Sequence, residues 1–142
     1  MALSFLIFII IGAGYVLNAT IGLFEDNPED RLYNRLLSGG LYFRHLLWAS
    51  VLLIFGVYRI YEGNDRDVWA ISPFIFLVLL RPINSIVKAG TGRNILIYTR
   101  WEKRPDNYSF FLDGITGFFL IVIPLVVPGY IMNKLIHGNL II

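Results

Sequence analysis

Four long apolar runs divide the chain, at about residues 2–24, 41–61, 68–87 and 110–132. A helix of about 20 apolar residues is long enough to cross a hydrocarbon core of about 30 Å. Hydrophobic residues make up 56% of the 142 residues and charged residues only 15%, with a mean hydropathy of +0.65. A soluble domain of this size has too small an interior to bury so much apolar surface. The sequence therefore predicts one all-α membrane domain over residues 1–142, with four transmembrane helices in a small bundle.

The third run is interrupted by charge. It is free of charged residues only from Val68 to Leu80, and these 13 residues would rise only about 20 Å as a helix. Pro82 removes one backbone hydrogen bond and disfavours helix at Arg81. We expect the helix to continue through Arg81 and Pro82 to Val87, with a bend.

A polar elbow with helix signals follows the first run. Asn27 is a suitable N-cap, Pro28 suits the first helical position, and Gly39 follows as a stop. The segment from Pro28 to Leu37 is thus predicted as a short interfacial helix, with Arg31 and Asn34 on its polar side. Its apolar side would face lipid or the bundle: Leu32, Tyr33, Leu36 and Leu37.

The cations are distributed unevenly over the connectors. Nine fall on the side of the first and third connectors: Arg31, Arg35, Arg44, Arg81, Lys88, Arg93, Arg100, Lys103 and Arg104. Three fall on the side of the termini and the second connector: Arg59, Arg66 and Lys134. The positive-inside rule then predicts a cytoplasmic basic loop over residues 88–109 and both termini outside, in a membrane such as the bacterial inner membrane.

The basic loop is the main candidate for a binding surface. Its cations and one tryptophan are suited to lipid headgroups or to a protein partner: Arg81, Lys88, Arg93, Arg100, Trp101, Lys103 and Arg104. The alternative is a solvated loop that merely follows the charge bias. Gly90 and Gly92 could form a small anion-binding nest, but their spacing matches no nucleotide-binding motif. Residues 95–101 suit either a short strand or an interfacial segment.

Five polar residues lie near the cytoplasmic ends of the runs: Asn18, Arg44, His45, Arg81 and Asp113. Ionisable groups inside a membrane are costly, so they usually face the bundle and pair. We expect Asp113 to pair with Arg81, or failing that with Arg44. In the alternative, both arginines extend separately to the headgroups.

One face of the first run carries small and polar residues four apart, namely Gly14, Asn18 and Gly22. Small residues at this spacing allow two helices to approach closely, and a buried asparagine can bond across the contact. The pattern predicts a helix-packing face. The alternative is that these glycines only reflect the high glycine content of membrane helices.

Support for catalysis is thin. The chain has no cysteine, and its two histidines, His45 and His137, lie far apart in sequence without the spacing of metal ligands. Asp113 and His45 could form an acid–base pair for lipid chemistry, although no nucleophile accompanies them. We expect no catalytic residues, no metal and no cofactor. The net charge of +2 does not indicate nucleic-acid binding.

The sequence thus favours a small membrane interaction module, such as an accessory, regulatory or immunity/effector-type subunit. Its partners would be membrane lipids, especially anionic ones, and another membrane protein or a second copy of itself. The alternative is a small homo-oligomeric channel or transporter. That alternative should place polar residues at mid-membrane, but the midpoints of the runs are apolar: Ile10, Val51, Phe76 and Ile121. A lipid-modifying enzyme is a third possibility.

Overall fold

The computed structural model describes residues 2–22, 31–98 and 104–137, and these parts of the chain contain helices and no strand. The elements in chain order are α1 (Ala2–Ile21), α2 (Leu32–Ser38), α3 (Leu41–Tyr61), η2 (Asp65–Ile71), α4 (Ser72–Thr91), η3 (Phe110–Ile115) and α5 (Thr116–Ile136). Four stretches are long and apolar enough to cross a membrane: Leu3–Ile21, Leu41–Tyr61, Asp65–Thr91 and Phe110–Ile136. The predicted all-helical fold with four candidate spans is confirmed.

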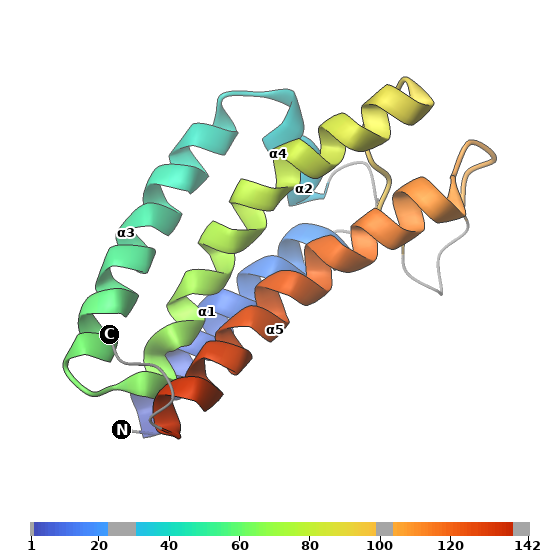
Figure 1. The fold of residues 1–142 in the computed structure, drawn as a ribbon. Helices are drawn as coiled ribbons and strands as arrows, with labels where there is room; N and C mark the ends of the chain where they lie inside the picture. The colour runs from blue at the N-terminus through green and yellow to red at the C-terminus, as the bar shows by residue number, and fades with distance from the viewer. Residues whose placement is uncertain (1, 23–30, 99–103, 138–142) are drawn as a thin grey trace.

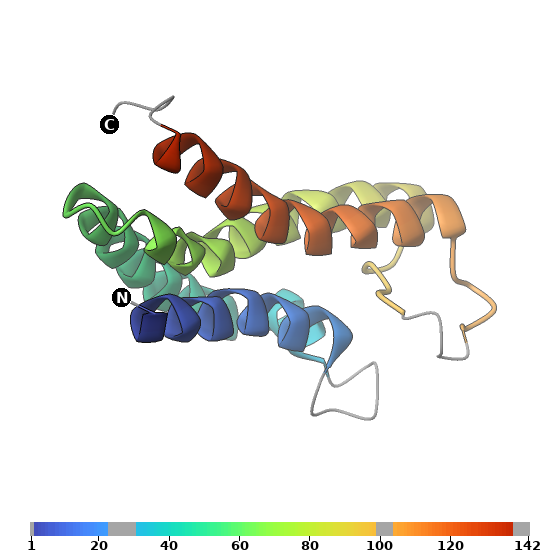
Figure 2. The same ribbon diagram turned by 90° about the horizontal axis from the view of Figure 1, so that it is seen from below.

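The helices form a bundle in which α4 is central (Figures 1 and 2). α4 contacts α1, α3 and α5, and its inward face follows the helical period. That face is buried along most of its length: Ser72, Pro73, Phe76, Leu77, Leu80, Asn84 and Val87. The beginning of α1 and the end of α5 lie at one end of the bundle, whereas α2, the end of α4 and the beginning of η3 lie at the other end (Figure 1). We call this second end the basic end, because the described cations gather toward it: Arg31, Arg35, Arg44, Arg81, Lys88, Arg93 and Arg104.

The third candidate span is longer than the predicted 68–87. The 3₁₀ turn η2 leads directly into α4, so the helical stretch runs from Asp65 to Thr91. Pro82 lies inside α4, and the expected continuation through Arg81 and Pro82 is confirmed. Lys88, which was assigned to the basic loop, instead lies in the last turn of α4.

α3 packs on the bundle through a narrow stripe. Tyr42, Ala49 and Gly56 are buried at intervals of seven residues, followed by Ile60. A Cβ at Gly56 would lie 2.9 Å from the Cβ of Ala70, so the small residues of this stripe permit the close approach of η2. The outer face of α3 exposes large apolar side chains: Phe43, Leu47, Val51, Ile54 and Phe55. Such a face suits lipid tails.

α1 approaches η2 at a glycine that the sequence pattern did not single out. A Cβ at Gly12 would lie only 2.0 Å from the carbonyl oxygen of Trp69. A Cβ at Gly14 would meet nothing within 4 Å, so Gly14 makes no close contact with the described residues. Gly22 ends α1 with a φ of +68°, a left-handed conformation that favours glycine. Among the described residues, the close approach of α1 to a neighbouring element is therefore at Gly12 rather than at Gly14 of the predicted face.

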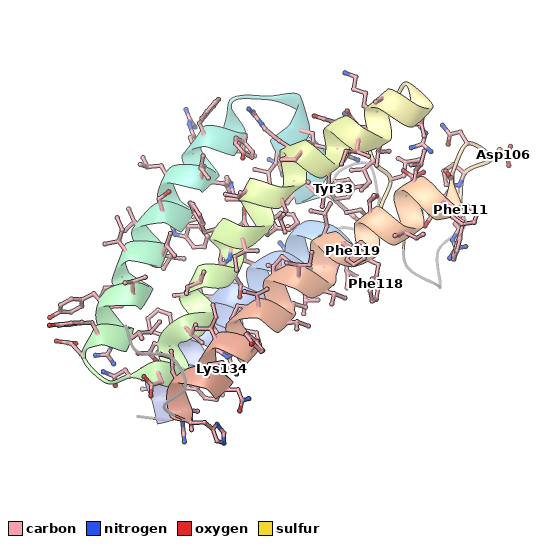
Figure 3. The ribbon with its side chains drawn as sticks, viewed as in Figure 1. Tyr33, Asp106, Phe111, Phe118, Phe119 and Lys134 are labelled. Atoms are coloured by element: carbon pink, nitrogen blue, oxygen red, sulfur yellow. The ribbon has the colours of Figure 1, made fainter. Side chains whose placement is uncertain are left out.

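α2 packs against the bundle rather than lying free on its surface. Tyr33 and Leu36 are fully buried, and Tyr33 points into the interior (Figure 3). Arg31, which was expected on the polar side, is only 1% exposed and precedes the first helical residue, Leu32. The predicted start at Asn27 and Pro28 lies outside the described residues.

The fourth span begins at Phe110 as predicted and extends to Ile136, past the expected end at Met132. Its first turn, η3, has π-helical geometry, since the amide of Gly114 donates to the carbonyl of Ser109, five residues before it, at 3.3 Å. Pro124 and Pro128 share the buried face of α5.

At the opposite end of the molecule, Arg59 of α3 donates to the buried Asp67 of η2 at 2.9 Å and fixes the short connector between them.

Candidate functional site

The basic end is built around an extended segment, residues 93–98, that returns into the bundle after α4. α4 ends at Thr91, and its C-cap Gly92 turns the chain back with a φ of +76°. The amide of Gly92 donates to the carbonyl of Lys88 at 2.8 Å. Ile95 and Ile97 are then buried in the core, at 0% and 4% exposure. Part of the predicted loop is thus an interior element rather than a solvated loop, and it is not a strand. Of the two glycines considered for an anion-binding nest, Gly90 lies inside α4 and Gly92 is its C-cap.

Side chains from other elements satisfy the backbone of this segment. The amide of Ile95 donates to Oδ1 of Asn84 at 2.8 Å, and the amide of Ile97 donates to the hydroxyl of Tyr33 at 3.1 Å. Nη1 of Arg31 donates to the carbonyl of Ile97 at 2.6 Å. Irregular backbone is tolerated at membrane depth only where such groups are paired inside the protein. Arg31, Tyr33 and Asn84 therefore determine where the segment lies.

Asp113 connects the segment to the fourth span. Its carboxylate accepts two hydrogen bonds from Arg93, at 3.0 and 2.7 Å, in a bidentate pair. It also accepts from the amide of Leu96 at 2.9 Å and from the amide of Ser109 at 2.8 Å. The Asp113 side chain is 0% exposed and that of Arg93 is 21% exposed. One buried carboxylate thus holds the end of α4, the extended segment and the beginning of η3 together.

The electrostatics of this network keep its members in fixed protonation states. Hydrogen bonding to Asp113 raises the pKa of Arg93 above its ordinary value, so the guanidinium stays charged. Burial raises the pKa of Tyr33, so its hydroxyl stays neutral while it accepts from Ile97. The network is therefore a permanent structural connection rather than a titrating site near neutral pH.

The prediction that Asp113 pairs with Arg81 or Arg44 is wrong, because Arg93 takes that place. The guanidinium of Arg81 instead lies over the ring of Tyr42, with Cζ 3.8 Å from the centroid, and near that of Phe43 at 5.0 Å. Stacking on aromatic faces stabilises an arginine without a carboxylate.

The rest of the predicted polar cluster lies elsewhere. The hydroxyl of Tyr15 and Nδ1 of His45 are 2.9 Å apart, so α1 and α3 are bonded at that point. Oδ1 of Asn18 is buried without a hydrogen-bond partner among the described residues. Arg44 is exposed and forms no ion pair with any described residue. Because Asp113 is engaged with Arg93 and His45 with Tyr15, the acid–base pair considered for lipid chemistry is not formed.

The predicted binding surface is divided by the structure. Lys88 and Arg104 are exposed, with Cζ of Arg104 5.1 Å from the centroid of the Tyr108 ring. Arg93 turns inward to Asp113 and is part of the scaffold. Arg100, Trp101 and Lys103 lie outside the described residues.

Two hollows open at the basic end. One of about 410 Å³ lies between the extended segment, Tyr108 and the first turns of the fourth span. Burial raises the pKa of Tyr108 at its edge, and Phe118 and Phe119 project outward beside it (Figure 3). A second hollow of about 390 Å³ lies between α1 and α3 and is lined by Tyr15, Leu41, Arg44, His45 and Trp48.

Within the described ranges, no three His, Cys, Asp or Glu side chains gather as metal ligands would. Sequence reasoning missed Arg31, Tyr33, Asn84 and Tyr15. Of these residues, Asn84 alone could have been noticed in the sequence, because it is a polar amide that follows Arg81 inside the third apolar run.

Comparison of the chain with protein-family models, with curated proteins and with solved structures finds no match. The arrangement of the basic end is therefore the basis for a functional conclusion.

Proposed function

We propose that this chain is a four-span membrane protein that acts as an interaction module, and that its basic end binds anionic lipid and another membrane protein. The observation that carries the proposal is the division of the cations at that end. Arg31 and Arg93 are bonded within the scaffold, whereas Arg44, Lys88 and Arg104 are exposed around it. The inward cations are part of a fixed scaffold, whereas the outward cations form no ion pair with a described residue.

A fixed platform favours binding for a physical reason. Holding charged side chains on a preorganised surface lowers the entropy lost when a ligand orders them. Anionic headgroups and acidic patches of a partner are both drawn to such a surface, with about 1 kcal/mol per cation near an anionic leaflet. The positive-inside rule places this end in the cytoplasm. The proposal therefore puts the binding surface at the cytoplasmic face of the membrane.

Charge reversal with a matched control tests lipid binding. We expect Lys88→Glu with Arg104→Glu to reduce the number of anionic phospholipids that native mass spectrometry finds on protein from mixed anionic and zwitterionic vesicles. Arg66→Glu is the control, because Arg66 is an exposed cation at the opposite end. Equal lipid retention by all variants would contradict the proposed role of the basic end.

Site-specific crosslinking in the native membrane tests partner binding. A photo-crosslinking residue at Lys88 should yield an adduct of one defined added mass, whereas the same residue at Arg66 should not. A ladder of adducts at multiples of the chain mass, together with ion conductance in planar bilayers, would instead favour the oligomeric channel and would contradict the module.

A further inference from the structure

We infer that the hollow between α1 and α3 is a binding site for one anionic glycerophospholipid, whose phosphate is held by Arg44 and His45. This inference rests on the proposed function and specifies its ligand and position. The hollow measures about 390 Å³ and opens at the basic end, where α3 begins. It is separate from the Arg93–Asp113 network.

The walls of the hollow are held by aromatic contacts between α1 and α3. The ring centroid of Tyr15 lies 5.3 Å from that of Trp48 and 5.8 Å from that of His45. Further along the same pair of helices, the Phe8 and Phe55 rings are 5.9 Å apart. Tyr15 also packs edge-on against Phe76 of α4, at 6.1 Å. The site is therefore supported by three helices.

His45 is oriented by its bond to Tyr15. The Tyr15 hydroxyl and Nδ1 of His45 are 2.9 Å apart, and Nε2 has no hydrogen-bond partner among the described residues. When the hydroxyl donates to Nδ1, the neutral ring carries its hydrogen on Nε2. That N–H can donate to a phosphate oxygen. Tyr15 thus acts as a positioning residue.

Among the described residues that line the hollow, the one charged side chain is a cation, Arg44. Arg44 is exposed without an ion pair to any described residue, and no carboxylate is found among the described residues that line the hollow. A guanidinium can bind two phosphate oxygens at once. The site is complementary to a phosphate rather than to a cation.

The remaining lining indicates a lipid rather than free phosphate. Leu41 and Trp48 border the cationic residues, and Trp48 is 41% exposed. Tryptophan favours the membrane interface, with its ring beside the glycerol and upper acyl region. Below it, α3 presents exposed Val51, Ile54 and Phe55 toward lipid tails. The hollow therefore offers cationic and polar side chains for a phosphate and apolar side chains for the upper acyl chains, as a phospholipid at the membrane interface requires.

The experiment measures anionic phospholipid bound to the full chain reconstituted in vesicles of phosphatidylglycerol and phosphatidylcholine. Native mass spectrometry across a range of phosphatidylglycerol fractions should give wild type one tightly retained molecule. We expect Arg44→Gln to weaken that binding about tenfold, with Arg44→Lys retaining part of it. Tyr15→Phe should weaken it less, because it only frees the His45 ring. Arg66→Gln should bind as wild type does.

Each contrary result has a distinct meaning. If Arg44→Gln and Lys88→Gln weakened phospholipid binding equally, the site in the hollow between α1 and α3 would be overturned. The proposed function of the basic end would remain intact. Unchanged binding in Arg44→Gln, Lys88→Glu and Arg104→Glu would overturn both. If inorganic phosphate raised the thermal midpoint in detergent as much as phosphatidylglycerol does, and Arg44→Gln removed both shifts, a free-phosphate site would replace the lipid site. Unfolding temperatures of the lipid-free variants show whether a loss of binding reflects a loss of fold.

Discussion

A buried charge in this molecule is stable only because its bonding capacity is filled. Asp113 is 1% exposed, and its carboxylate accepts from Arg93 and from the amides of Leu96 and Ser109. Removing one partner of a buried pair leaves the other charge uncompensated, which typically costs about 3–5 kcal/mol. The Arg93 side chain is 21% exposed and can still reach water. We therefore expect the loss of one partner to cost near the lower end of that range, about 3 kcal/mol.

The first prediction is that Arg93 and Asp113 are energetically coupled. In a double-mutant cycle, Asp113→Leu should lower the free energy of unfolding by about 3 kcal/mol. The loss in Arg93→Leu with Asp113→Leu should be smaller than the sum of the single losses, by about 2 kcal/mol. Reversible unfolding in detergent measures these values. Arg81→Leu is the control. Its loss in free energy of unfolding and that of Asp113→Leu should add, within about 0.5 kcal/mol, to the loss in the double variant. Additivity of the Arg93 cycle would contradict the pair.

The second prediction concerns two glycines of α1. Gly12→Ala should destabilise the protein by about 1–3 kcal/mol, because the added Cβ would lie 2.0 Å from the carbonyl oxygen of Trp69. Gly14→Ala should be neutral or slightly stabilising, since a Cβ there meets nothing within 4 Å. Thermal unfolding of the two variants measures the difference. The opposite ranking would mean that α1 packs through the Gly14 face.

At the scale of elements, residues 93–98 show how irregular backbone can lie inside an apolar bundle. The segment has no regular secondary structure to bond its amides, so Asn84, Asp113 and Tyr33 accept from Ile95, Leu96 and Ile97 in turn. These acceptors come from α4, η3 and α2. The three elements and the segment should therefore be ordered together.

The third prediction is that Asn84→Leu loosens this segment. The substitution leaves the amide of Ile95 without its acceptor, and an unsatisfied buried amide costs about 1–3 kcal/mol. Hydrogen exchange over residues 94–98 should accelerate while the middle of α3 keeps its protection. Ser85→Ala is the control, because Ser85 is exposed and bonds only within its own helix. Unchanged exchange in Asn84→Leu would mean that Asn84 does not hold the segment.

For the whole molecule, the fold places the beginning of α1 and the end of α5 at one end, and the end of α4 and the beginning of η3 at the other (Figure 1). The fourth prediction follows from this arrangement. The chain has no native cysteine, so Asp106→Cys, Arg66→Cys and His137→Cys each give a single labelling site. An impermeant thiol reagent should label Arg66→Cys and His137→Cys from outside the cell. It should label Asp106→Cys only from the cytoplasmic side. Labelling of Arg66→Cys and Asp106→Cys from the same side would contradict the four-span fold. Full reversal of all three would contradict only the orientation.

The sequence alone determined the helical class, the four candidate spans and the end at which the cations gather. These properties depend on local composition, because about 20 apolar residues suit a membrane helix whatever they pack against. The passage of the third helix through Pro82 was also predictable, since the run before it is too short. The four successive spans then place both termini at one end.

Only the tertiary structure decided which polar groups meet. Arg31 bonds to Ile97, 66 residues away, and Tyr33 bonds to the same residue, 64 residues away. Arg93 rather than Arg81 reaches Asp113 because Gly92 turns the chain back into the bundle, while Arg81 lies against Tyr42. Similarly, Gly12 rather than Gly14 faces the backbone of η2. Hydropathy and spacing describe each helix by itself, whereas these contacts depend on how helices rotate and approach one another, which is a property of the packed bundle.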